Sequence, residues 1–295
     1  MFLSSKFKEK LRKNKNYYTL GVLFIIAVFA WIGVLARESS GFLEVNFFDV
    51  GQGDAIFIEV PGGNQILIDG GPDDKILEKL GREMPFWDRS IDMIILTHPE
   101  KDHVLGLIEV LKRYKITDIL WTGIVRNTSE YEEWIKLIPE EGAAVKIIKA
   151  GERIRFTDDI FMDVIYPLEN LEGKKIKESN NTSIVSRLVF GSTSFLFTGD
   201  MEKSAEYEVL GRGAYLDSDV LKVGHHGSKT STSDEFLKAV SPLMAVIEVG
   251  KNNRYGHPVQ EILDRIIENS AKIFRTDLNG DIKIISDGNT LKLAH

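Results

Sequence analysis

The stretch "THPEKDH", residues 97 to 103, places two histidines, a glutamate and an aspartate within seven positions. It follows the apolar run "IDMIIL" at 91 to 96, which is typical of a buried β-strand. In open α/β sheets, ligand sites lie at the carboxyl ends of such strands. Imidazole nitrogens and carboxylate oxygens suit divalent ions such as Zn²⁺, Mn²⁺ or Fe. The stretch therefore predicts a metal site, although Asp102 could simply cap the helix that follows.

The other histidines strengthen this prediction. The chain has six, and apart from the first pair they include an adjacent pair at 225 and 226 and His257 in a "GHP" turn. The second pair also follows an apolar run, "DVLKVG" at 219 to 224, and a third run, "TSFLFTGD", ends in Asp200. Three apolar strands that each end in metal-type ligands indicate one shared site.

Composition narrows the chemistry. The 295 residues are 43% hydrophobic and 27% charged, which is ordinary for a globular chain, and cysteine is absent. The missing cysteines exclude disulfides, zinc–thiolate sites and thiol nucleophiles. There is also no G-x-S-x-G and no Walker loop to compete with the histidine motifs.

The N-terminal part predicts a membrane anchor. Residues 17 to 36, "YYTLGVLFIIAVFAWIGVLA", run for 20 positions without a charge, which is about the length of a transmembrane helix. Residues 1 to 16 form a basic tail with six cations against Glu9 alone, so the positive-inside rule places them in the cytoplasm. The sequence thus predicts a single-pass protein of the cell membrane, with a linker at 37 to 42 and an extracytoplasmic domain at 43 to 295.

Two alternatives exist for the apolar run. A cleaved signal peptide usually has an apolar core of only about 7 to 15 residues, and "LARESS" is a poor cleavage site. A buried globular helix normally keeps one polar face. An uncleaved anchor explains the run best.

The charge of the remaining chain limits its partners. With +5 on residues 1 to 16 and −7 overall, residues 17 to 295 carry −12. Such an acidic domain has no obvious basic surface for non-specific nucleic-acid binding. A phosphate-containing substrate would therefore need metal ions or a local cationic patch.

The domain alternates strands and helices, which predicts an α/β sandwich of two mixed sheets between helical layers. Strands are expected at 43–50, 54–60, 64–70, 91–96, 117–120, 144–148, 160–165, 184–190, 194–198, 219–223, 243–248, 272–275, 281–285 and 290–293. Helices are expected near 103–113, 129–137, 201–210, 233–240 and 259–268.

The ordered motifs resemble the metallo-β-lactamase superfamily, and within it the hydrolase domain of ComEC-type competence proteins, which handle DNA at the cell surface. These motifs, all quoted from residue 47 onward, are "FFDVGQGDAIFIE", "LIDGG", "THPEKDH", "NNTSIV", "FLFTGD", "LKVGHHGSKTS" and "NRYGHP". The resemblance covers about Leu43 to the C-terminus. It implies the αββα fold, with the site along the edge where the two sheets meet.

The resemblance also implies ligands for two divalent metal ions. "THPEKDH" is similar to the family's H-x-H-x-D-H motif, with Glu100 where the second histidine usually stands. The implied set is His98, Glu100, Asn181 and Asp200 for one ion and Asp102, His103, Asp200 and His225 for the other. Because oxygen donors outnumber nitrogens in this set, Mn²⁺ is favoured modestly over Zn²⁺.

Further roles follow from the resemblance. Asp69, and with it Asp54, corresponds to a carboxylate that orients a metal-binding histidine, although each could merely stabilise a turn beside glycine. The residues expected to face the substrate are His226, Ser228, Lys229, Asn253 and His257. The imidazole of His257 could instead cap the helix that follows it.

The implied activity is hydrolysis by a water whose pKa is lowered between two ions, with Asp200 bridging them and Asp102 positioning the water. The expected substrate is a phosphodiester, in particular DNA, with a separate membrane channel protein as a possible partner because this chain has one apolar segment only. Hydrolysis of a lactam, lactone or thioester is an alternative, and so is a non-catalytic surface binding module.

Overall fold

The computed structural model describes residues 15 to 37 and 41 to 294, and the chain divides into two units, 1–40 and 41–295. The first unit contains helix α2, Lys15–Arg37. Across the described residues, no helix has both the length and the apolar run that crossing a bilayer requires, so the predicted span at 17–36 is not supported. Most of the predicted basic tail, and residues 38–40 of the predicted linker, lie outside the described residues.

The second unit contains two sheets. The first has the strand order β15-β14-β1-β2-β3-β4-β5-β6. In chain order its strands are β1 (Leu43–Phe47), β2 (Ile56–Glu59), β3 (Gln65–Ile68), β4 (Ser90–Ile95), β5 (Lys115–Trp121), β6 (Ala144–Ile147), β14 (Ile282–Ser286) and β15 (Leu291–Ala294). The pairs from β3 to β6 are parallel, whereas those from β15 to β3 are antiparallel.

The second sheet has the order β13-β12-β11-β10-β9-β8-β7. Its strands are β7 (Arg153–Arg155), β8 (Ile160–Tyr166), β9 (Val185–Phe190), β10 (Thr193–Phe197), β11 (Val220–Lys222), β12 (Met244–Ile247) and β13 (Lys272–Arg275). Strands β10 to β13 are parallel to one another.

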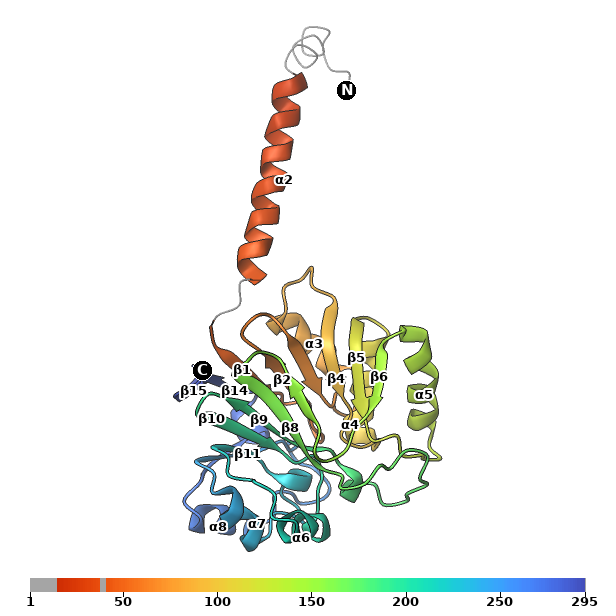
Figure 1. Ribbon diagram of the computed structural model, residues 1–295, viewed down its shortest axis with the longest axis vertical. Helices are drawn as coiled ribbons and strands as arrows, with labels where there is room; N and C mark the ends of the chain where they lie inside the picture. The colour runs from red at the N-terminus through yellow and green to blue at the C-terminus, as the bar shows by residue number, and fades with distance from the viewer. Residues whose placement is uncertain (1–14, 38–40, 295) are drawn as a thin grey trace. The chain divides into compact units, whose positions relative to one another are not determined.

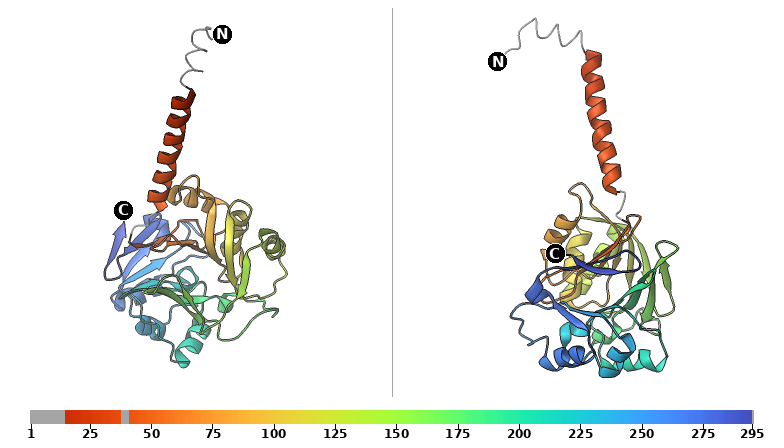
Figure 2. Two further views of the ribbon diagram at one scale, coloured as in Figure 1. Left: turned by 45° about the horizontal axis from the view of Figure 1, so that its top comes forward. Right: turned by 90° about the vertical axis from the view of Figure 1, so that its left-hand side faces the viewer.

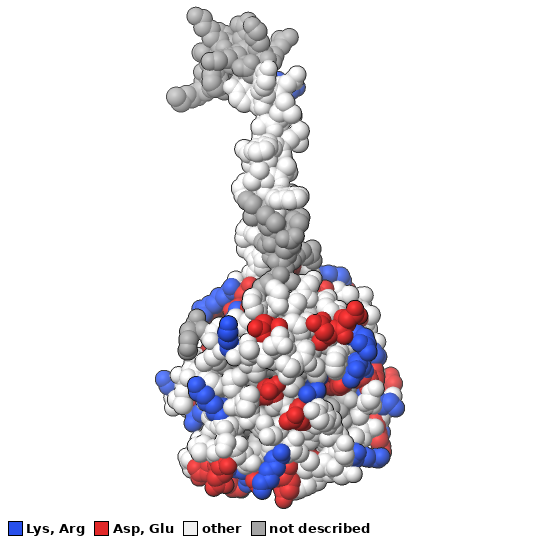
Figure 3. All heavy atoms as spheres, turned by 60° about the vertical axis from the view of Figure 1, so that its left-hand side comes forward, with Lys and Arg blue, Asp and Glu red and all other residues white. Residues whose placement is uncertain are grey.

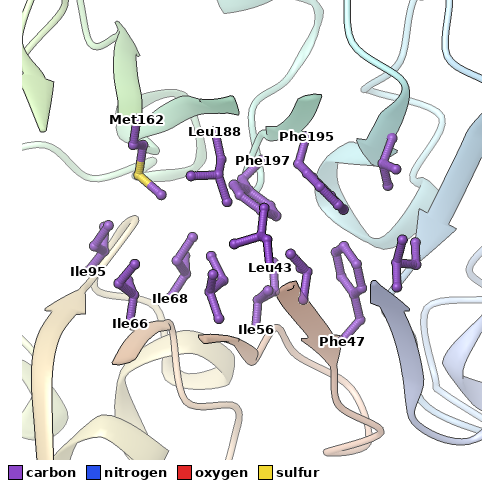
Figure 4. Close-up of a cluster of buried hydrophobic side chains, with 14 of the residues drawn as sticks. Leu43, Phe47, Ile56, Ile66, Ile68, Ile95, Met162, Leu188, Phe195 and Phe197 are labelled. Atoms are coloured by element: carbon purple, nitrogen blue, oxygen red, sulfur yellow. The ribbon is translucent and has the colours of Figure 1, made fainter. Parts of the chain in front are cut away.

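The two sheets pack face to face through an apolar layer (Figure 4). Side chains of the first sheet, such as Phe47 and Ile68, point toward Leu188 and Phe197 of the second. In β8, buried and half-buried residues alternate, as expected for a strand with one face on this core. Strand β10 is buried along its whole length because it is covered on both faces.

Helices cover the outer faces of both sheets (Figures 1 and 2). On the first sheet they are α3 (Lys75–Glu83), α4 (Lys101–Leu111) and α5 (Ser129–Glu141), and on the second α6 (Lys203–Gly211), α7 (Asp234–Val240) and α8 (Gln260–Glu268). Three short helices, η1 (Asn180–Thr182), η2 (Gly224–Gly227) and α9 (Thr276–Asn279), lie in connections. The predicted αββα sandwich is therefore confirmed.

Some elements differ from the predictions. Helix α3 and strand β7 were not predicted, because "KILEKLGRE" is short and charged and "RIR" offers only three residues. The predicted strand 43–50 ends at Phe47, since Val50 to Gly53 turn toward helix α4. Helix α4 begins at Lys101 rather than 103, so Asp102 and His103 both lie in its first turn.

The topology brings five strand ends to one rim. The carboxyl ends of parallel strands β3 and β4 meet those of β10, β11 and β12 from the other sheet. The close contact between Gly70 and helix α4 fixes this rim, because a Cβ on Gly106 would lie 1.8 Å from the Gly70 carbonyl oxygen. Only glycine at both positions lets the loop after β3 reach the start of α4.

Candidate metal centre

Five side chains converge at this rim. They are His98, Asp102, His103, Asp200 and His226, and their ligand atoms form overlapping groups in which three atoms lie within 4.8 Å of one another. Asp200 is central, with its carboxylate oxygens 3.9 Å from His98 Nε2, 3.5 Å from His103 Nε2 and 3.6 Å from His226 Nε2. We call these five residues the metal-ligating cluster.

Hydrogen bonds orient the first two imidazoles. Asp69, in the left-handed region at φ 57°, accepts from Thr97 Oγ1 at 2.6 Å and from His103 Nδ1 at 2.8 Å. Because the Thr97 hydroxyl proton goes to Asp69, its oxygen accepts from His98 Nδ1 at 3.0 Å. Both imidazoles thus carry their proton on Nδ1, and each turns the lone pair of Nε2 toward Asp200.

His226 is oriented in the same way from the other sheet. Its Nδ1 donates to the Glu248 carbonyl oxygen at 2.9 Å, and because a carbonyl can only accept, the proton is on Nδ1. Its Nε2 lies 3.4 Å from Asp102 Oδ2. The left-handed backbone at His226, φ 52°, lets the imidazole reach inward from η2.

The cluster fits a divalent metal ion. The Nε2 atoms of His98, His103 and His226 and Oδ1 of Asp200 are buried and have no hydrogen-bond partner among the described residues. A buried polar atom without a partner costs about 1–3 kcal/mol, so four such atoms in overlapping groups fit a bound cation. Imidazole nitrogens and carboxylate oxygens in this number are the donors of zinc, iron and manganese sites.

Burial and neighbouring charges shift the pKa values of the residues in the cluster. Burial, with repulsion from His103, lowers the pKa of His98 to about 3. Burial also opposes charge on His226, yet Asp200 and Asp54 raise its pKa to about 10. Conversely, the pKa of Asp200 stays well below its usual value despite burial, because His226 and His103 lie beside it. The carboxylate is therefore ionised and ready to bind a cation.

A second layer of charge lies behind the cluster. The fully buried Lys222, at the end of β11, donates its Nζ to Asp54 and to the Gly199 carbonyl oxygen at 2.8 Å. Although burial disfavours the Asp54 carboxylate, Lys222 lowers its pKa. Burial and the nearby Asp54 raise the pKa of Glu248 well above its usual value, and its Oε1 accepts from the Ala55 amide at 2.9 Å.

Two predicted ligands lie elsewhere. Glu100 forms an ion pair with Arg126 at 2.7 Å and accepts from Ser179 Oγ. Asn181 donates to Ser204 Oγ at 2.9 Å and accepts from the Glu202 amide at 3.0 Å. The structure brings neither side chain into the cluster, because each completes hydrogen bonds with the loops at its edge.

The two adjacent histidines lie at different depths. His226, predicted to face the substrate, is buried in the cluster, whereas His225 is partly exposed and lies 3.2 Å from Glu202 through Nδ1. His225 Nε2 is still 3.8 Å from Asp200, so it lies at the mouth of the cluster. Sequence alone could not separate the two, because both residues adopt a left-handed backbone inside one short turn.

The remaining predicted residues surround this mouth. Ser228 is buried and its hydroxyl lies 3.0 Å from that of Thr230, while the Lys229 backbone accepts from Lys203. Asn253 holds its own loop, donating to the His257 carbonyl oxygen at 2.7 Å. His257 does not cap α8. Its ring centroid lies 5.8 Å from that of His225, and its buried Nδ1 has no partner among the described residues.

Several residues of the site were not predicted. They are Lys222, Glu248 and Thr97, which lie at or within two positions of a strand end, and Arg126, in the loop after β5. A lysine inside the apolar run "DVLKVG" was the available signal, since a buried lysine requires an acidic partner. The revised cluster holds three imidazoles and two carboxylates, so the predicted excess of oxygen donors, and with it the preference for Mn²⁺ over Zn²⁺, no longer follows.

The fold, the strand-end histidines and the shared aspartate define a metallo-hydrolase architecture. The model of the metallo-beta-lactamase superfamily matches residues 48–247, and the chain belongs to this superfamily. Within it, the chain is related to competence proteins.

Two relatives carry that relationship. ComE operon protein 3 of Bacillus subtilis is 35% identical over 258 residues, which are 81% of this chain and 32% of that protein. Competence protein ComA of Neisseria gonorrhoeae is 33% identical over 66% of this chain and 25% of its own length. The chain thus spans about a third or less of these relatives.

Solved structures agree on the fold. A metallo hydrolase from the archaeon Ignicoccus hospitalis matches 82% of this chain and 98% of its own, with a TM-score of 0.54 and 15% identity. CmlA, a diiron β-hydroxylase from Streptomyces venezuelae, matches 82% of this chain and 53% of its own, with a TM-score of 0.52 and 14% identity.

Proposed function

We propose that this protein is a metal-dependent phosphodiesterase that cleaves DNA. The observation that carries the proposal is the set of three inward-facing Nε2 atoms around the ionised carboxylate of Asp200. The chemistry that divalent ions supply at such a site is Lewis acidity toward substrate oxygens and ionisation of a water near neutral pH. The relationship to competence proteins favours DNA as the substrate.

The protein's own residues divide the work. His98, His103, Asp200 and His226 are buried and would hold the ions, fixed from behind by Asp69, Thr97 and the Glu248 carbonyl. The Asp102 side chain is 29% exposed, so it is the member of the cluster that solvent reaches. Asp102 Oδ2 would accept a hydrogen bond from the attacking water and orient it toward the phosphorus.

Charge explains why the metal is needed for this substrate. The chain has a net charge of −7, so its overall field repels a phosphodiester. The two divalent ions predicted from the sequence would offset that repulsion at the scissile phosphate. Location at the cell membrane, an extracytoplasmic domain and a separate channel partner stay predictions from the sequence.

The test uses the full chain. Purified protein is stripped with chelator, reloaded with Mn²⁺, Zn²⁺ or Mg²⁺, and assayed for bound metal and for digestion of single-stranded and duplex DNA. We expect cleavage with at least one ion and its loss in Asp200→Asn. The matched control is Asp118→Asn, since this aspartate of β5 has no side-chain partner among the described residues. Cleavage of nitrocefin or a lactone, with no DNA cleavage under any ion, would contradict the proposal in favour of carbonyl hydrolysis. Neither bound metal nor any turnover would favour a binding module.

A further inference from the structure

A cationic pocket lies beside the metal-ligating cluster. It has a volume of about 700 Å³ and is lined by Val125, Arg126, Asn127, Thr128, Lys175, Ile176 and Lys177. Three of these residues are cations and none is acidic. We call it the Lys175–Lys177 pocket. By contrast, basic and acidic side chains are interspersed over the face of the molecule seen in Figure 3.

Two chain segments build this pocket. Val125, after the end of β5, forms a parallel bridge with Lys175, and its amide donates to the Lys174 carbonyl oxygen at 2.9 Å. Arg126 donates to the Ile176 carbonyl oxygen at 3.1 Å and also to that of Lys177. Arg126 thus forms one side of the pocket and holds the 174–177 segment in place through these hydrogen bonds.

Arg126 also connects the pocket to the metal-ligating cluster, through an ion pair. Arg126 Nη2 lies 2.7 Å from Glu100 Oε1, and the Glu100 amide donates to the His98 carbonyl oxygen at 3.0 Å. Glu100 also stands two residues before Asp102. One ion pair therefore links the pocket to the segment that carries the cluster residues, so a strand with a phosphate at the cluster could continue into the pocket.

The lysines are available for a ligand. Lys174 is paired with Glu169 at 3.0 Å, whereas Lys175 and Lys177 are exposed and have no acidic partner among the described residues. Their ammonium groups can contact phosphate oxygens, and Val125 and Ile176 offer apolar surface to a sugar or a base. Pockets that bind small organic ligands have volumes of roughly 300–1,000 Å³, which includes this one.

We propose that the Lys175–Lys177 pocket binds a nucleotide unit of a nucleic-acid strand, next to the phosphate at the metal-ligating cluster, with both lysines on its backbone phosphate. The proposal rests on the phosphodiesterase function above. The Lys175–Lys177 pocket would supply the local cationic patch that an acidic domain requires to bind a polyanion. A small phosphodiester would fill the cluster without reaching this pocket.

The experiment compares Lys175→Glu/Lys177→Glu with the control Lys272→Glu/Lys292→Glu in the full chain. The control lysines are exposed and stand at the starts of β13 and β15, which run parallel to the cluster's strands, so they lie at the opposite rim. Binding of fluorescein-labelled dT12 is followed by anisotropy in chelator. Turnover of bis(4-nitrophenyl) phosphate is measured with the activating metal.

We expect the pocket variant to bind dT12 at least tenfold more weakly. We also expect the magnitude of its slope of log affinity against log salt to fall by about 0.7, the value for one phosphate contact on a single strand. Turnover of the small phosphodiester stays unchanged, Lys175→Arg/Lys177→Arg binds like wild type, and the control changes nothing. Unchanged dT12 binding in the glutamate variant, or equal loss in the control, overturns the pocket. Wild-type protein that binds dT12 through these lysines but cleaves no phosphodiester refutes the proposed activity and leaves the pocket standing.

Discussion

His226 Nε2 lies 3.4 Å from Asp102 Oδ2 and 3.6 Å from Asp200 Oδ2, so one imidazole lies close to a carboxylate of helix α4 and to another that follows β10. The neighbouring His225 faces Glu202 instead. Substituting His226 with alanine should therefore weaken metal binding at least 100-fold, whereas His225→Ala should change it by less than about tenfold, as expected for a residue outside the buried ligand set. Metal titration after chelator treatment measures both. The opposite ranking would restore the ligand set implied by the sequence.

Asp69 should act on the metal through His103. Asp69→Asn keeps the shape and tolerates the left-handed backbone at φ 57°, but weakens the acceptor that fixes the His103 proton on Nδ1. We expect metal affinity to fall roughly 10–100-fold, as for other partners of ligating histidines. Competition with a chromogenic chelator measures the change, with Asp118→Asn as the control. An affinity within twofold of wild type would mean that Asp69 serves the turn alone.

Glu100 should be dispensable for metal stoichiometry. Its carboxylate is engaged by Arg126 and Ser179, so Glu100→Gln should keep the full metal content, as should Asn181→Ala. Elemental analysis of the purified variants measures this, beside Asp200→Asn, which should lose metal. One ion fewer in Glu100→Gln would return this carboxylate to the ligands.

The buried Lys222 should be a large contributor to stability. Replacing it with methionine leaves Asp54 buried without its counterion, which costs about 3–5 kcal/mol. Urea unfolding in chelator measures the loss, and adding Asp54→Asn should recover a large part of it. Lys146→Met is the control, because its pair with Glu152 is exposed and worth less than about 1 kcal/mol. Equal effects of the two lysines would contradict the buried pair.

Glu59 should make stability depend on pH. Burial and the facing Glu44 raise its pKa to about 7 from 4.5. A carboxyl whose folded pKa exceeds its unfolded value favours folding below pH 4.5, and that contribution is lost as pH rises through about 7. Glu59→Gln should therefore be about 1–2 kcal/mol more stable than wild type at pH 8, after allowance for solvent screening, and equal at pH 4. Thermal unfolding at both pH values measures it, and the same gain at both would rule out the charge.

Much of the site was predictable because strand ends are visible in sequence. Apolar runs that stop shortly before His98 and Asp200 place both residues at one rim without any knowledge of how the sheets pack. What could not be predicted depends on side-chain direction. Whether His225 or His226 points inward is decided by two left-handed residues in η2, and Glu100 leaves the cluster because Arg126, distant in sequence, reaches it.

The fold shows the same division. Strand β12 is apolar throughout, β4 and β10 end in buried apolar runs, and all three strands were predicted. Helix α3 was missed because its apolar face is confined to a few residues, with only Ile76, Lys79 and Leu80 buried. Its position depends on packing against α4 rather than on a local pattern.

The metal-ligating cluster draws His98 and His103 from the loop and helix that follow β4, and Asp200 and His226 from the segments that follow β10 and β11. An ion bound by all four residues would crosslink the two halves of the sandwich at this one rim. Among the described residues, the far rim, where the parallel strands begin, has no comparable group of ligand atoms. Thermal unfolding should therefore begin at the far rim. The rim that carries the metal-ligating cluster should be the last part of the sandwich to unfold.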